Sequence, residues 1–153
     1  MCEEIAVRQV TVEDLPKVAA LFDLYRQFYK RDSSPESARA FLAERIGNNE
    51  SVIFVAETPS GEARGFTQLY PSFTSLGMAR TWIVNDLYVV ENARGIGIGK
   101  MLMRAAYEHA LATNARSLSL ETHVDNAQAR ALYESLGYEA ETEFMMYSRS
   151  VTK

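Results

Sequence analysis

A glycine-rich segment in the second half of the chain has the residue types that bind a phosphate group. It reads Arg94-Gly95-Ile96-Gly97-Ile98-Gly99-Lys100, and it lies between a predicted strand (80–90) and a predicted helix (100–114). Glycines let a backbone approach a ligand closely, and the first turn of a helix presents N–H groups without a partner inside the helix. Arg94 adds a fixed positive charge that suits phosphate oxygens. We therefore predict that this segment binds a phosphorylated ligand, with a plain tight turn as the alternative.

Two nucleotide-binding motifs are excluded by single positions. A P-loop needs a glycine five residues before the Gly-Lys pair and Ser or Thr after it, but this chain has Arg94 and Met101 there. The dinucleotide motif G-x-G-x-x-G fails too, because it would need glycine in place of Lys100 or of Leu102. The remaining pattern is Arg-x-x-Gly-x-Gly, which consists of Arg94, Gly97 and Gly99.

A second motif follows one predicted strand later. It has the form Asn-x-x-Ala-x-x-Leu-Tyr-x-x-x-Gly-Tyr, with Asn126, Ala129, Leu132, Tyr133, Gly137 and Tyr138 at its fixed positions. Asn126 and Tyr133 are separated by about two helical turns and so share one face of a helix. Both can point at one ligand; the alternatives are an ordinary N-cap for Asn126 and a packing role for Tyr133.

The rest of the chain predicts the elements that position these motifs. Alternating or apolar runs predict strands over 5–10, 52–56, 65–70, 80–90, 117–122 and 144–148. Helical spacing and capping residues predict helices over 15–29, 35–46, 100–114 and 127–136, and residues 71–79 are expected to be a loop. This order indicates a mixed α/β sheet with helices on both faces.

Composition narrows the class of protein. The 153 residues fit one domain over 1–153, with 47% hydrophobic and 24% charged residues. A net charge of −4 without a basic stripe argues against nucleic acid as a partner. No apolar run is long enough to cross a membrane, and Cys2 is the single cysteine, so we expect a cytoplasmic protein without a disulfide or a metal site.

Together the two motifs resemble the signature of the GNAT superfamily of N-acetyltransferases. The resemblance extends from about Ile5 to Tyr147 in element order and is sharpest over 85–138. Within the superfamily, segments 82–89 and 25–29 are similar to the branch that contains polyamine acetyltransferases and the small yeast histone and polyamine acetyltransferases.

The resemblance implies a mostly antiparallel α/β sheet with a splayed central strand pair and direct acetyl transfer from acetyl-CoA to an amine. Residues 94–100 would hold the pyrophosphate of the cosubstrate. The pantetheine arm would lie in the splay, in contact with Leu87, Tyr88, Val89 and, from the other side, Asn126. A backbone N–H near Val89 would stabilise the oxyanion.

For the chemistry, the resemblance assigns the general acid for the thiolate to Tyr133. The base stays open among Asp86, Glu121 and His123, acting alone or through a water molecule. Polyamine enzymes of this type carry an acidic residue where this chain has Asn85, so that role does not transfer.

We expect a small-molecule amine as the acceptor, such as a polyamine or an amino acid. The alternatives are a protein N-terminus or lysine, and a sensor that binds acetyl-CoA without catalysis. A homodimer is compatible with the resemblance. Tyr25, Phe28 and Tyr29 could line an acceptor pocket, but aromatic residues at helical spacing usually form core, and we expect core here.

Overall fold

A five-stranded mixed sheet forms the centre of one of two compact units. The computed structural model describes residues 4–152, and the chain divides into the units Met1–Glu121 and Thr122–Lys153. The strands lie in the order β1-β2-β3-β4-β5, with antiparallel ladders except for the parallel pair β4–β5. Their bounds are β1 (Ala6–Gln9), β2 (Val52–Glu57), β3 (Ala63–Thr74), β4 (Ala79–Val89) and β5 (Leu118–Leu120). The predicted mixed, mostly antiparallel sheet is confirmed; Cys2 lies outside the described residues.

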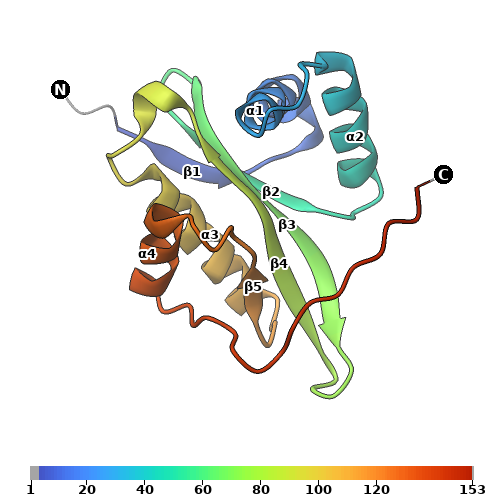
Figure 1. Cartoon of the computed structure of the whole chain (residues 1–153). Coiled ribbons are helices and arrows are strands. Elements are labelled where there is room, and N and C mark those ends of the chain that lie inside the picture. The colour runs from blue at the N-terminus through green and yellow to red at the C-terminus, as the bar shows by residue number, and fades with distance from the viewer. Residues whose placement is uncertain (1–3, 153) are drawn as a thin grey trace. The chain divides into compact units, whose positions relative to one another are not determined.

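Helices cover both faces of this sheet (Figure 1). The helices α1 (Leu15–Phe28) and α2 (Pro35–Gly47) lie on one face, which we call the α1 face, and the 3-10 turn η1 (Val12–Asp14) leads into α1. The helix α3 (Ile98–Ala112), preceded by the 3-10 turn η2 (Glu91–Ala93), lies on the opposite α3 face. The core of the α1 face consists of Leu15, Val18, Ala19, Leu21, Phe22, Ala38, Leu42, Ile53, Val55 and Phe66.

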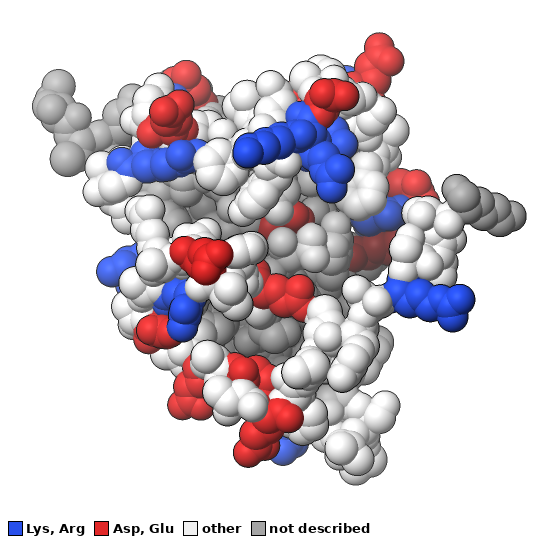
Figure 2. Space-filling view, viewed as in Figure 1, with Lys and Arg blue, Asp and Glu red and all other residues white. Residues whose placement is uncertain are grey.

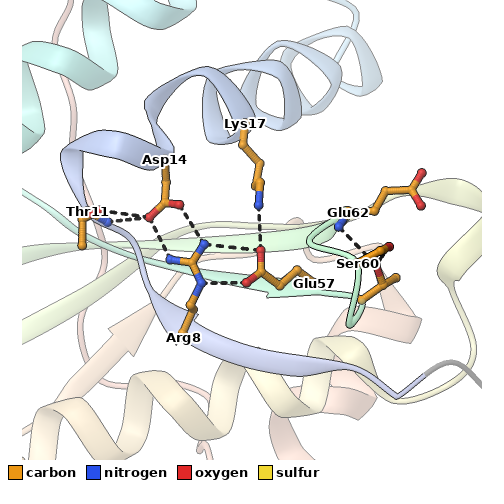
Figure 3. A network of polar contacts seen from close by, with 8 residues as sticks. Arg8, Thr11, Asp14, Lys17, Glu57, Ser60 and Glu62 are labelled. Carbon is orange, nitrogen blue, oxygen red and sulfur yellow. Dashed lines mark hydrogen bonds and ion pairs between the residues drawn. The ribbon is translucent and has the colours of Figure 1, made fainter.

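An ion-pair network fixes the start of α1 against the sheet (Figure 3). Arg8 of β1 donates to the carboxylates of Asp14 and Glu57, at 2.7 Å each. Lys17 of α1 donates to the other Glu57 oxygen at 2.8 Å. The hydrogen bonds from Arg8 hold the pKa of both carboxyl groups below their ordinary values. The network therefore connects β1, β2 and the start of α1.

The predicted loop over residues 71–79 is mostly strand. β3 continues to Thr74 and β4 begins at Ala79, so the turn between them covers only residues 75–78. Proline is tolerated within a sheet where its missing N–H faces an open edge. Pro71 pairs with Trp82, while the ladder to β2 ends at Leu69, so β3 has that open edge at Pro71.

The second unit contains the helix α4 (Ala127–Ser135). It starts after the predicted cap Asn126 and is followed by Gly137 at a φ of +92°, as expected of a residue that ends a helix. The predicted strand over residues 144–148 is wrong, because these residues have no ladder partner among the described ones. Their apolar side chains favour a pleated, half-buried surface, and that preference needs a neighbouring strand to act on.

Candidate active site

The predicted phosphate-binding segment connects η2 to α3 and is suited to an anion. Gly97 is the N-cap of α3 at a φ of +93°, and Gly95 has a φ of +85°. No side chain caps this helix start, so the N–H groups of its first turn have no acceptor from a capping residue. Both glycines are exposed, and a Cβ on either would meet no atom within 4 Å. Glycine is required here by the left-handed backbone rather than by lack of space.

Arg94 is exposed, but its side chain also contacts neighbouring parts of the protein. Its Nε donates to the carbonyl of Val89 at 2.9 Å, and its guanidinium carbon lies 5.0 Å from the ring centre of Phe28 and 5.7 Å from that of Tyr88. Arg94 thus connects the glycine segment to the end of β4 and to the end of α1. The sequence predicted its charge but not this position.

The strands β4 and β5 separate after a short common ladder. They pair from Trp82 to Val84 on β4, whereas β4 continues to Val89. Over its last five residues β4 has a strand neighbour on the β3 side only, within the part of the chain that the structure describes. The edge that would face β5 is therefore open, as the predicted splay requires.

A β-bulge at Asn85 reorients the end of β4. The register pairs Leu69 with Val84 but Gln68 with Asp86, so Asn85 is the extra residue. Before the bulge, Trp82 faces α3, since its Nε1 donates to Thr113 at 2.8 Å.

After the bulge, Tyr88 faces α1, and its ring centre lies 6.1 Å from that of Tyr25. Residues an even number of positions apart share a face in a regular strand. The bulge thus turns Asp86 and Tyr88 from the α3 face to the α1 face.

The bulge also decides which backbone groups of β4 face the open edge. The N–H of Val90 donates to the carbonyl of Arg64 across the ladder at 2.9 Å. Hydrogen-bonded and open pairs alternate along an antiparallel ladder, so the N–H and C=O groups of Leu87 and Val89 point away from β3. Of the three predicted pantetheine contacts, Leu87 and Val89 are placed for backbone pairing, whereas the backbone of Tyr88 faces β3.

Asp86 is the central acidic residue of the α1 face. Its side chain is buried with 5% of its surface exposed, and Gln68 Nε2 donates to Oδ2 at 2.8 Å while Asn85 Nδ2 donates to Oδ1 at 3.2 Å. The charge of this carboxylate also acts on the hydroxyl of Tyr25. The two donors, from β3 and β4, hold the carboxylate in one orientation.

Two tyrosines next to Asp86 are kept neutral. Burial, followed by the charge of Asp86, raises the pKa of Tyr70 to about 12. The same two effects raise the pKa of Tyr25 well above its ordinary value. Both hydroxyls are therefore protonated at neutral pH and can donate a hydrogen bond to a ligand.

Aromatic residues at the end of α1 form an exposed wall beside this carboxylate. Phe28 and Tyr29 are 56% and 57% exposed, so the expectation that they form core is wrong for both. Tyr25 is half-buried and contacts Tyr29 at 5.1 Å between ring centres. The aromatic residues after Phe22 lie outside the core, because Phe22 is the last buried aromatic residue of α1 and the helix extends beyond it.

The other predicted residues lie in different surroundings. Glu121 is exposed directly after β5, and His123 is exposed with Nδ1 accepting from the N–H of Asp125 at 3.1 Å. Asn126 caps α4, since its Oδ1 accepts from the N–H of Ala129 at 3.1 Å. Tyr133 lies on α4, and its ring centre is 6.1 Å from that of Tyr138. Of the residues considered as a base, Asp86 is the buried one, and its carboxylate accepts from two side-chain donors.

Sequence reasoning missed Gln68 and Tyr70. Gln68 has no exposed surface, although glutamine is rarely fully buried without a reason. The signal was a polar side chain at the centre of an apolar strand, two positions before a tyrosine.

The distribution of charged side chains and of possible metal ligands bears on which partners the chain can bind. On the face shown in Figure 2, acidic and basic residues are interspersed, without a continuous basic stripe among the described residues. In the described part of the chain no three His, Cys, Asp or Glu side chains are grouped to hold a metal ion. Within residues 4–152, no helix has the length and apolar character that a membrane crossing needs.

Comparison with known proteins agrees with this geometry. The family model described as acetyltransferase (GNAT) family matches residues 18–138. An uncharacterized N-acetyltransferase of Bacillus subtilis, YhfO, is 46% identical over 145 residues, which cover 95% of this chain and 97% of that protein. The D-amino-acid N-acetyltransferase HPA3 of Saccharomyces cerevisiae is 27% identical over 97% of this chain and 92% of its own length.

A solved structure extends the similarity to three dimensions. The crystal structure of a probable acetyltransferase superposes with a TM-score of 0.92 at 41% sequence identity, covering 97% of this chain and 99% of that one. The family match spans the open edge of β4, the glycine segment and α4. The chain is an N-acetyltransferase that belongs to the GNAT family.

Proposed function

We propose that this enzyme transfers the acetyl group of acetyl-CoA directly to the amine of a small molecule, with Asp86 as the residue that binds and deprotonates the amine. The observation that supports this proposal is the bulge at Asn85. It turns the Asp86 carboxylate to the α1 face and leaves the backbone of Leu87 and Val89 directed to the open edge of the same strand. An acceptor amine and a thioester are thereby assigned to the same few residues of β4.

The first task of the site is to supply a neutral amine. A primary ammonium has a pKa near about 10 and must lose a proton before it can attack. A buried carboxylate held by two neutral donors favours a cation next to it, and the tyrosine rings beside it complement an ammonium group. Asp86 then takes the proton, directly or through one water molecule.

The transfer itself needs donors for two developing negative charges. The amine nitrogen bonds to the thioester carbon, and the carbonyl oxygen becomes an oxyanion for which the N–H of Val89 is our proposed donor. The C–S bond then breaks, and the sulfur accepts a proton for which Tyr133 is the proposed source. The nitrogen has one proton too many once the new bond has formed, and it gives that proton to the Tyr133 phenolate, while Asp86 releases the first proton to water.

The glycine segment is the proposed pyrophosphate site. Its uncapped helix start and two left-handed glycines fit an anion, and Lys100 in the first turn of α3 adds positive charge. Arg94 would give up its hydrogen bond to the Val89 carbonyl when the cosubstrate binds, because the pantetheine arm is expected at the same backbone edge. The guanidinium would then contact the cosubstrate.

The burial of Asp86 favours a small-molecule acceptor over a protein. To reach this carboxylate, a protein side chain would have to pass the aromatic residues at the end of α1. The relative HPA3 acts on D-amino acids by its name, and the narrower resemblance at residues 82–89 is to polyamine enzymes. Both are compatible with one ammonium at Asp86.

The test is acetyl transfer to a panel of amines, with free CoA measured by a thiol reagent. We expect amine-dependent release of CoA that follows saturation kinetics. If the protein binds acetyl-CoA but acetylates no amine, protein N-terminus or lysine peptide, it is a sensor rather than an enzyme of this kind.

A further inference from the structure

Among the residues that the structure describes, three buried side-chain atoms on the α1 face have no hydrogen-bond partner. They are the Nε of Arg45, the Oγ of Ser51 and the Oε1 of Gln68. Buried polar atoms are nearly always paired, and leaving one unpaired costs about 1–3 kcal/mol. Such atoms at one place indicate a site that a polar ligand completes.

The fold brings these atoms together around Tyr70. Gln68 and Tyr70 share a face of β3, since they are two positions apart. Ser51 directly precedes Val52, which pairs with Leu69, so it lies at the Tyr70 end of the ladder between β2 and β3. Ser51 also shares the α1 face with Ile53, which belongs to the core of that face.

Arg45 joins the group from the end of α2. The N–H of Glu50 donates to the carbonyl of Arg45 at 2.8 Å, which holds the segment before Ser51 against this helix. The guanidinium lies 4.7 Å from the ring centre of Phe41, and Phe41 stacks on Phe22 of α1 at 5.7 Å. The charge of Arg45 also acts on the hydroxyl of Tyr70, opposite in sign to that of Asp86.

The existing partners of Arg45 are weak. One guanidinium nitrogen lies 2.9 Å from a carboxylate oxygen of Glu44, whose side chain is 65% exposed. Its Nε lies 3.4 Å from Glu50 in an ion pair that does not have hydrogen-bond geometry. Exposed pairs of this kind contribute about 0–1 kcal/mol, so a ligand anion can replace them.

The Tyr70 region therefore has the two halves of a receptor for a zwitterion. On one side, the Asp86 carboxylate and the Gln68 oxygen accept hydrogen bonds, as an ammonium requires. On the other side, the unpaired Arg45 Nε and Ser51 Oγ and the protonated Tyr70 hydroxyl can each donate a hydrogen bond, as a carboxylate requires.

We propose that the acceptor is an amino acid, with its amine at Asp86 and its carboxylate at Arg45, Ser51 and Tyr70. The inference rests on the proposed function and narrows its substrate class. The exposed aromatic wall of Phe28 and Tyr29 would contact the acceptor's side chain, which favours an apolar or aromatic one. A polyamine fits less well, because Arg45 and Arg94 place positive charge at both ends of the aromatic group.

The test compares phenylalanine with phenylalanine amide, which lacks only the carboxylate charge, in wild type and Arg45→Met. We expect kcat/KM for phenylalanine to fall by about tenfold or more in Arg45→Met, from the lost charged hydrogen bonds, and kcat/KM for the amide to change by less than about threefold. Phenylalanine and its amide differ in amine basicity. This difference cancels when the loss of kcat/KM from wild type to variant is taken for each substrate and the two losses are compared as a ratio. Arg39→Met, an exposed arginine on the same helix, is the control and should change neither value.

The outcomes separate the two proposals. Equal losses for both substrates, no loss for either, or a preference for spermidine over every amino acid would overturn the zwitterion site while leaving the acetyltransferase in place. If Arg45→Met does not fold, Ser51→Ala gives the same comparison with a smaller change. Absence of acetyl-CoA binding by the wild type would instead refute the proposed function itself.

Discussion

Trp82 and Tyr88 lie six residues apart on β4, yet they face opposite sides of the sheet. Trp82 donates to Thr113, the residue directly after α3, whereas Tyr88 contacts Tyr25 of α1. The single extra residue Asn85 causes this change of face, and the same change carries Asp86 from a helix-packed surface to the proposed acceptor site. The bulge is thus the structural feature on which the proposed chemistry depends.

The glycine segment gives the first prediction. Replacing Gly97 by valine forces a side chain into a left-handed conformation that costs about 1–2 kcal/mol and moves the first N–H groups of α3. We expect affinity for acetyl-CoA and for desulfo-CoA to fall by about tenfold or more in calorimetric titrations. The control is Gly47→Ala, at a helical glycine with open space around it, which should leave both affinities unchanged. Tight binding by Gly97→Val would remove the pyrophosphate assignment.

Tyr133→Phe tests the source of the sulfur proton. The variant keeps the ring and its contact with Tyr138 but removes the phenolic proton. We expect kcat to fall by about tenfold or more while acetyl-CoA affinity stays within about twofold, since general acids contribute about that much or more. A parallel loss of affinity would mean that Tyr133 binds the cosubstrate instead.

His109 should make folding stability depend on pH. It lies against Trp82 at 4.9 Å between ring centres, and burial lowers its pKa. The unfolded chain, with a histidine pKa of about 6.5, takes up the proton before the folded one, so stability is lost as the pH falls through this range.

We therefore expect Tm to decrease between about pH 8 and pH 5, and to decrease less in His109→Gln. The matched control is His123→Gln, at the exposed second histidine, which should retain the wild-type slope. Parallel slopes in all three proteins would show that burial of His109 does not produce the effect.

Most of the architecture follows from local sequence patterns. The glycines, the capping residues around Asn126 and Gly137, and the apolar runs of β2 and β4 each determine structure within a few residues. The bulge could not be predicted in this way, because Asn85 and Asp86 sit in a continuous β-forming run and register is fixed by the pairing of β3 with β4.

The acceptor site was harder to predict for a related reason. Gln68 and Tyr70 lie on β3 and Arg45 lies on α2, and these two elements meet only in the folded chain, so no local spacing connects the strand residues with Arg45. The polarity of Gln68 within an apolar strand was the one sequence signal. The end of α1 shows the opposite error, since helical spacing suggested core for Phe28 and Tyr29 but could not show where the covered sheet ends.

The most direct measurement is amine-dependent release of CoA by wild type and by Asp86→Asn, with acetyl-CoA affinity measured on the same samples. Asparagine keeps the size of the side chain and one acceptor oxygen but cannot take the proton or balance the ammonium charge. We predict a loss of about a hundredfold or more in kcat/KM, within the usual range for a general base, with unchanged acetyl-CoA affinity and an unchanged far-ultraviolet circular dichroism spectrum. Wild-type kcat/KM in a folded Asp86→Asn variant would contradict the central role of Asp86 and of the bulge that positions it.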